Sequence, residues 1–284
     1  MKLTQKIPLG IFIFAVALTT ILTLAVNFII MPSFQSIEDR FVIDNAERAK
    51  NTILNDIHRL EYNVKDWSIW DEFYEMYHDV ENLPEWLEAE VSAEALENLN
   101  ANIMLLMSKD NQLLAYRYLN RSSHTLEPLE QALLDDIHDI IIDNDVVGGN
   151  AVSGVAKVAD QAVIFSTRPM NRHSTYDLGL APSQGSFFMA LFINNDYQQF
   201  LEQTTKQSIQ LSILPEGTHP DASTHIVATD DAFIKASFVM NDEKGSSVLL
   251  ATVEHERSIH SEARNSQLIF VSSLIVVTVL TSLL

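Results

Sequence analysis

The sequence predicts an α+β protein in which a long helix, an antiparallel sheet and a second, smaller sheet lie between two transmembrane helices. Three observations support this prediction. Apolar runs occupy both ends of the chain. Residues 36–77 contain neither Pro nor Gly and repeat apolar side chains at helical spacing. From residue 103 onward, short apolar runs separated by turn-forming residues replace that spacing, as is typical of strands.

The first apolar run extends from Pro8 to Met31 without a charged residue. A helix of about 24 residues is roughly 36 Å long, which is enough to cross the core of a bilayer. A cleaved signal peptide has a shorter apolar core, followed by a small-residue cleavage site, and the Ala-x-Ala of residues 15–17 lies inside this run. We therefore expect an uncleaved transmembrane helix over residues 8–31.

The charges around this helix predict its orientation. Lys2 and Lys6 precede it and no acid does, so the positive-inside rule places residues 1–7 in the cytoplasm. Residues 32–266 are then an extracytoplasmic domain on the periplasmic side of a bacterial inner membrane. The apolar run from Leu268 to Leu284 has about 17 residues, or roughly 25 Å of helix, which is marginal for a span. We interpret residues 267–284 as an incomplete second transmembrane helix of a receptor; a short tail anchor is the alternative.

The segment between the two runs is strongly acidic. It holds all 38 Asp and Glu residues but only 16 of the 18 Lys and Arg residues, giving a net charge of −22. Such a surface repels nucleic acid and anionic lipid head groups, so no nucleic-acid partner is expected. It either attracts cations or simply stays well solvated. The absence of cysteine excludes a disulfide framework and a thiolate metal site.

A single helical seam is expected in the first half of this segment. Its members recur at alternating steps of four and three residues. They are Ile53, Ile57, Leu60, Val64, Trp67, Asp71 and Tyr74. An acidic, irregular stretch from Glu81 to Asn100 comes after the seam, and Pro84 opens a short helix within it.

The second half of the segment is expected to form most of the sheet structure. The predicted strands cover residues 103–107, 113–119, 151–158, 162–167 and 186–193, with a helix over 129–142 inserted after the second strand and a polar loop over 171–184. A helix over 195–207 comes next, then strands over 209–214, 233–240 and 247–253 that form the smaller sheet nearer the membrane. A polar helix over 254–267 leads into the second apolar run. Five strands with one helix inserted, behind a long N-terminal helix, resemble an extracellular PAS- or Cache-like module.

One nine-residue stretch carries a more specific resemblance. Residues 66–74 read D-W-S-I-W-D-E-F-Y, and the pattern D-W-x-x-W-D-x-x-Y on a helix close after a membrane span is similar to the fourth CHASE family. Residues 100–110 and 165–170 resemble that family's first strand and a later R-P segment. The resemblance implies a sensory domain between two spans that controls a cyclic-di-GMP enzyme or a histidine kinase. It implies no particular ligand. A homodimer is expected because Ile37, Phe41, Arg48 and Thr52 line part of the membrane-proximal helix, and a lone helix gains most of its stability by packing.

The same stretch supplies the first candidate binding residues. Trp67, Trp70 and Tyr74 cover one face of a continuous helix, and Asp71 falls among them. A carboxylate among aromatic rings is costly unless it is paired, so this face is a candidate wall for a cationic or amine-bearing small molecule. Two structural interpretations remain open. Ser68 to Asp71 fits a capping box at the start of a new helix, and the tryptophans fit a core.

Two further candidates lie on the predicted strands. Arg168 ends one strand, and Tyr116 precedes Arg117 on another, so a carboxylate ligand could be held near Tyr116 and Arg168; pairing of the arginines with the abundant acids is the alternative. We expect no cofactor, no metal site and no enzymatic activity, because the chain contains no catalytic motif and His255 and His260 are five residues apart rather than four. The leading interpretation is a receptor's sensor module. The alternative is an anchored periplasmic protein that regulates a partner.

The topology is directly testable. Alkaline phosphatase fused after residue 120 should be active, because the acidic segment is expected outside the membrane, whereas green fluorescent protein fused at the same point and exported by the same route should be dark. The reverse pattern would overturn the sensor interpretation.

Overall fold

The computed structural model describes residues 3–172, 184–215, 217–218, 225–227 and 232–283. The chain forms two compact units. The first comprises Met1–Ala46, His225–Ser237 and Val253–Leu284, and the second comprises Glu47–Thr224 and Phe238–Thr252. The polar loop expected over residues 171–184 lies mostly outside the described residues.

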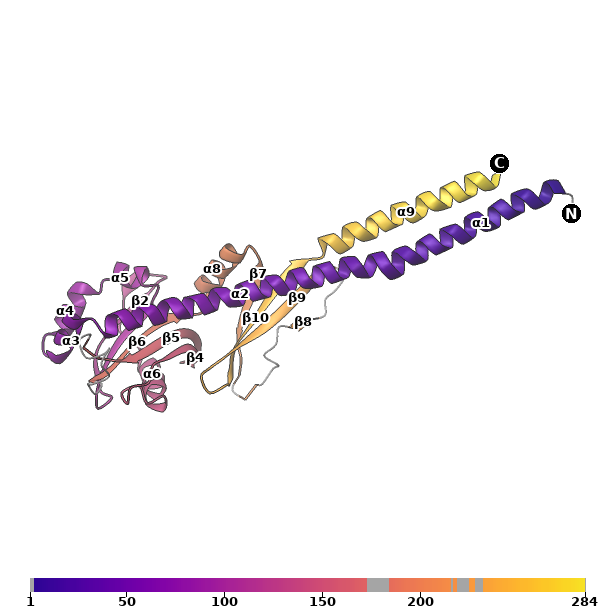
Figure 1. The fold of residues 1–284 in the computed structure, drawn as a ribbon. Coiled ribbons are helices and arrows are strands. Elements are labelled where there is room, and N and C mark those ends of the chain that lie inside the picture. The colour runs from indigo at the N-terminus through magenta and orange to yellow at the C-terminus, as the bar shows by residue number, and fades with distance from the viewer. Residues whose placement is uncertain (1–2, 173–183, 216, 219–224, 228–231, 284) are drawn as a thin grey trace. The chain divides into compact units, whose positions relative to one another are not determined.

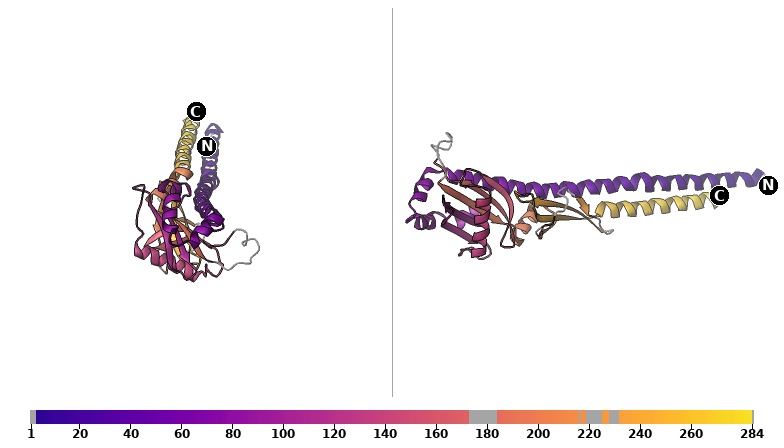
Figure 2. Two further views of the ribbon diagram at one scale, coloured as in Figure 1. Left: turned by 90° about the vertical axis from the view of Figure 1, so that its left-hand side faces the viewer. Right: turned by 90° about the horizontal axis from the view of Figure 1, so that it is seen from below.

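The first unit is built on two long apolar helices that lie side by side (Figure 1 and Figure 2). Its elements are α1 (Leu3–Ala25), the π-helix η1 (Val26–Ile30), the start of α2 (Met31–Ser68), β8 (His225–Val227) and α9 (Ser258–Leu283). Stretches Phe12–Ser68 and Ser261–Leu280 each contain a window long and apolar enough to cross a membrane. Thr19 and Thr278 share a side-chain hydrogen bond of 2.9 Å between these helices.

A buried ion pair joins α2 to the residue that precedes α9. Arg257, between β10 (Ser247–Glu256) and α9, donates from Nε to Glu38 of α2 over 3.2 Å. Both side chains are shielded, Glu38 at 1 % exposure, so the pair is a fixed link between the chain segments that enter the two apolar helices. In the same unit the rings of Phe41 and His255 are in contact, with centroids 4.7 Å apart.

The second unit is the α+β domain that the sequence predicts, with more strands than expected. Its helices are the rest of α2, α3 (Asp71–His78), α4 (Leu83–Glu90), α5 (Ala93–Asn98), α6 (Gln131–Asp143) and α8 (Asn195–Thr205). Its large-sheet strands are β1 (Ile103–Ser108), β2 (Leu113–Asn120), β3 (Thr125–Leu126), β4 (Val152–Val158), β5 (Gln161–Pro169) and β6 (Gly185–Phe192). Their order is β3-β2-β1-β6-β5-β4, with antiparallel pairing throughout. The five expected strands are confirmed, and the two-residue β3 is an addition.

A second sheet has the order β7-β10-β9-β8, where β7 is Ser208–Ile213 and β9 is Phe233–Asn241. The three strands expected here are therefore confirmed. The three-residue β8, which pairs with Lys235–Ser237 of β9, was not predicted.

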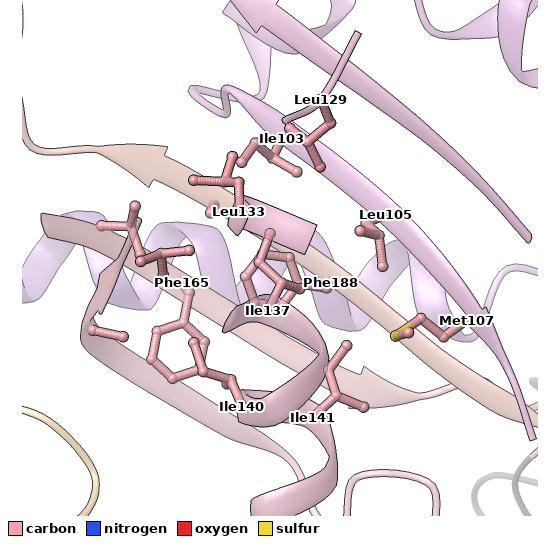
Figure 3. Packing of buried hydrophobic residues seen from close by; sticks show 14 of the residues in the cluster. Ile103, Leu105, Met107, Leu129, Leu133, Ile137, Ile140, Ile141, Phe165 and Phe188 are labelled. Atoms are coloured by element: carbon pink, nitrogen blue, oxygen red, sulfur yellow. The ribbon is translucent and has the colours of Figure 1, made fainter. Parts of the chain in front are cut away.

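Apolar side chains are buried on both faces of the large sheet. Alternate residues of β1 and β6, such as Leu105 and Phe188, face α6 and pack with Ile137 and Ile141 in a continuous apolar core (Figure 3). Phe187 and Met189, one residue out of step, face the other way and are fully buried. Strand β6 therefore contributes alternate side chains to the core under α6 and to a second core on the opposite face.

The long helix confirms most of the expected seam. Ile53, Ile57, Leu60 and Val64 of α2 are buried at the predicted spacing. The seam then stops, because α2 ends at Ser68 and α3 begins at Asp71. Asp71 is exposed, so the expectation that it continues the apolar seam is wrong. A new helix does start at Asp71, but the expected capping box from Ser68 to Asp71 does not form, because the N-cap is Trp70 and makes no side-chain cap.

The new helix is anchored by a tyrosine. The Tyr77 hydroxyl lies 2.8 Å from the carbonyl oxygen of Met107 and 2.7 Å from that of Gln184. Burial raises the pKa of Tyr77 far above its ordinary value, so the hydroxyl stays a donor. It sits directly over Gly185, whose φ is +156°, and a Cβ there would collide with the hydroxyl and with the Met107 carbonyl. The first residue of β6 therefore has to be glycine.

We expect Gly185→Ala to lower the free energy of unfolding by about 2–4 kcal/mol, since it combines a glycine-only conformation with overpacking. Gly154→Ala in β4 is the matched control. A Cβ there meets only Phe165, at 4.0 Å, so the change should be neutral or stabilise by up to about 1 kcal/mol. Denaturant unfolding of the purified chain in detergent, monitored by circular dichroism, measures both; equal stabilities would contradict the packing described.

Candidate functional site

The candidate site lies where the long helix breaks. Ser68 is fully buried at the end of α2 and its hydroxyl donates to the Lys65 carbonyl over 3.0 Å. The Ser68 carbonyl, left without a partner within the helix, accepts the Asn171 N–H over 3.1 Å. Trp70 then adopts an extended conformation, with φ −71° and ψ 118°, and α3 starts at Asp71. A backbone hydrogen bond from the segment after β5 thus compensates the break.

Aromatic rings gather around the break. Trp67 makes edge contacts with Trp70 and Phe73, at centroid distances of 5.7 and 5.3 Å, and stacks on Phe187 of β6 at 6.3 Å. Trp86 of α4 stacks on Phe73 at 5.6 Å and lies 6.1 Å from Trp70. We call these five residues the aromatic cluster. Phe73 and Phe187 are its buried centre, and Trp70 is its exposed edge, at 40 % exposure.

A hollow of about 500 Å³ opens beside this edge. It is lined by Asp66, Trp67, Ile69, Trp70 and Asp71. The two aspartates end one helix and start the next, and both are exposed. The hollow therefore combines two indole rings with two carboxylates, which is a chemistry suited to an organic cation.

The hollow includes three of the six candidate residues, namely Trp67, Trp70 and Asp71. Tyr74 lies one turn further along α3, under the Arg172 guanidinium, which is 5.7 Å from the ring centroid and 2.9 Å from Glu75. Tyr74 is thus occupied by an intramolecular cation and does not line the hollow.

The two strand candidates lie on opposite faces of the sheet. Tyr116 pairs with Leu105 and packs on the α6 side, where its hydroxyl accepts the Leu129 N–H over 3.3 Å. Arg168 pairs with Phe187 and so belongs to the face of the aromatic cluster. The structure therefore does not bring Tyr116 and Arg168 into one pocket.

The sequence model of the CHASE4 domain matches residues 52–212, which is more than half of the chain. The chain belongs to the CHASE4 family. A CHASE4 domain is an extracytoplasmic sensory domain of transmembrane receptors, so this domain is an input module. The stretch of residues 66–74 that resembles the family is the one that builds the aromatic cluster and its hollow.

Solved structures support the fold. The periplasmic domain of Vibrio cholerae LuxQ superposes with a TM-score of 0.51 at 10 % identity, over 76 % of this chain and 99 % of that domain. The extracellular domain of the putative histidine kinase vpHK1S-Z8 gives a TM-score of 0.51 at 8 % identity, over 81 % of this chain and 98 % of that domain. At such identities the likeness is one of fold alone. No curated protein matches the chain in sequence.

A buried polar contact ties α2 to α8 within the CHASE4 domain. The Tyr197 hydroxyl donates to Asp56 over 2.8 Å, and Arg59 binds the other oxygen of the same carboxylate over 3.2 Å. Burial, and then the Asp56 charge, raise the pKa of Tyr197 far above its ordinary value. The Tyr197 hydroxyl therefore stays a donor, and its hydrogen bond holds α8 to α2.

Sequence reasoning overlooked Phe73, Trp86 and Phe187 as parts of the site. Phe73 and Tyr77 are spaced i, i+4, which would have revealed the buried face of a helix starting at Asp71. Trp86 lies in the short helix expected after Pro84, but nothing in the sequence linked it to residues 66–74. Among the described residues, no three His, Asp or Glu side chains are placed to share a metal ion.

Proposed function

We propose that this chain is the input half of a bacterial inner-membrane receptor. Residues 1–7 lie in the cytoplasm, residues 8–31 and 267–284 cross the membrane, and residues 32–266 form the periplasmic sensor. The single observation that carries the proposal is a CHASE4 domain bounded by two helices able to span a membrane. Lys2 and Lys6 support the orientation. The chain itself is not an enzyme.

The output of such a receptor is a cytoplasmic cyclic-di-GMP enzyme or histidine kinase. The second candidate function is an anchored periplasmic protein that regulates a partner through its outer domain. Sequencing the gene downstream of codon 284 distinguishes the two proposals. A reading frame that continues into an output domain supports the receptor, and a stop codon supports the regulator.

We propose further that the hollow at the helix break receives a small organic cation. Its rings offer negative π faces, and Asp66 and Asp71 offer charge without needing to be desolvated before the ligand arrives. The net charge of −22 between the two apolar runs raises the local concentration of cations. A ligand here touches both α2 and α3, so it stabilises one geometry of the break.

Thermal-shift measurements on the purified chain, screened against polyamines, amino acids and quaternary ammonium compounds, test this site. A ligand at 100 times its Kd stabilises by about 2.7 kcal/mol. We expect Asp66→Asn combined with Asp71→Asn to abolish the shift, because the double change removes both carboxylates of the hollow. Trp70→Ala should reduce it.

Glu72→Gln is the matched control, because it removes one exposed carboxylate from the same turn of α3 outside the hollow. All these positions are at least partly exposed, so each variant should fold. If the double aspartate variant keeps the full shift for every hit, the ligand binds elsewhere.

We also propose that the receptor is a homodimer that pairs along the membrane-proximal part of α2. Ile37 and Phe41 remain 50 % and 40 % exposed there, and Arg48 and Thr52 continue the same line. Because the chain has no cysteine, single-cysteine variants from residue 37 to 52 can be cross-linked in membranes without background. Cross-linking should recur every three to four residues, with Ile37→Cys among the maxima. A flat profile would contradict the dimer.

A further inference from the structure

A groove in the first unit is not used by the proposed sensing function. It has a volume of about 370 Å³ and lies between the helices that enter and leave the membrane. Its lining comes from the α1-to-α2 segment and from α9: Val26, Ile30, Met31, Phe34, Ile259, Glu262, Ala263, Ser266, Gln267 and Phe270. Val26 to Met31 end the first apolar run and Phe270 lies near the start of the second, so the groove is expected at the outer margin of the bilayer.

Specific contacts join the helices that line the groove. The Gln267 side chain donates to the Asn27 side chain over 2.9 Å at the level of the groove, and Thr19 meets Thr278 deeper in the apolar region. Glu38 and Arg257 fix the other end. Between them the chain forms a π-helix over Val26–Ile30, a rare geometry that frequently marks functional positions.

The chemistry of the lining is graded. Val26 and Ala263 are buried and, with the half-buried Phe34, make an apolar floor, whereas Glu262 and Ser266 are exposed at its edge. Apolar surface is more stable in contact with apolar groups than with water. A volume above about 300 Å³ is in the range of pockets that hold small ligands. The occupant must therefore be apolar along its body and polar at one end.

We propose that this groove binds an acyl chain of a phospholipid from the outer leaflet, with a zwitterionic, ammonium-bearing head group such as phosphatidylethanolamine near Glu262. The bilayer surrounds both helices with acyl chains at the concentration of a solvent, so mass action favours a lipid. The acidic domain beyond the groove disfavours an anionic head group. Lipid packing thereby acts as a second input, because the bound chain sets the spacing of α1 and α9.

A helix from a second copy fits this space less well. A helix is 10–12 Å across, so one turn of it fills roughly 400–600 Å³, more than the groove contains. The exposed apolar side chains of α2, Ile37 and Phe41, lie outside the lining and are the better surface for a second copy.

Photolabelling of the full chain tests the proposal. The chain is reconstituted in nanodiscs of phosphatidylethanolamine that carry a diazirine on one acyl chain, irradiated, and mapped by mass spectrometry. Adducts should concentrate on Met31, Phe34 and Ile259. Phe28 and Ile269 are 75 % and 72 % exposed but lie outside the lining, so they should be labelled less than these three residues. Ser266→Trp fills the groove from its edge and should lower groove labelling by about tenfold, equivalent to ~1.4 kcal/mol of binding.

Ser273→Trp is the control, because it places the same side chain at an exposed position of α9 outside the lining. A Thr19→Cys/Thr278→Cys pair shows whether the helices still lie together in each variant. If the disulfide still forms and labelling follows exposure alone, or if Ser266→Trp leaves groove labelling unchanged, the site does not exist. Adducts confined to nanodiscs of phosphatidylglycerol, or groove residues cross-linked to a second copy, would also overturn the proposal.

Discussion

The hydrogen bond from the Asn171 N–H to the Ser68 carbonyl is the constraint on which the sensory end of the molecule depends. A helix of 38 residues has to stop somewhere, and its last carbonyls need partners. By supplying a partner from the chain after β5, the domain ends α2 at a buried serine. The chain then restarts as α3, whose Phe73 and Tyr77 are buried against β6 and β1.

Much of this fold was predictable, and the reasons for the misses are physical. The apolar ends, the seam of α2 and the five main strands follow from periodicity, which burial enforces over many residues. The break at Ser68 does not, because residues 66–74 contain no Pro or Gly and the group that stabilises the break lies about a hundred positions away. Strands β3 and β8 have two and three residues, too few to show alternation, and exist because a longer neighbour offers an edge.

The candidate site was predictable to the same extent. A motif dense in aromatic side chains identified the region, and Trp67 and Trp70 do lie in the aromatic cluster. Which of these residues is buried could be assigned only once the position of the helix break was known. On an unbroken helix Asp71 falls among the rings and Phe73 falls outside, whereas the restarted helix exposes Asp71 and buries Phe73. Because the helix restarts at Asp71, Phe73 rather than Asp71 lies in the core.

Two buried polar contacts, one in each unit, fix the position of α2 against its neighbours. Asp56 holds Tyr197 within the sensory domain, and Glu38 holds Arg257 where α9 begins. Replacing such pairs by apolar side chains often leaves a protein as stable or more stable, so they are poor explanations of stability. They do fix the position of one helix along another, because a buried polar side chain is costly in any position where it loses its partner. Within either unit, a shift of α2 by one turn, about 5.4 Å, would leave its buried carboxylate without that partner, so each contact selects one position of the helix.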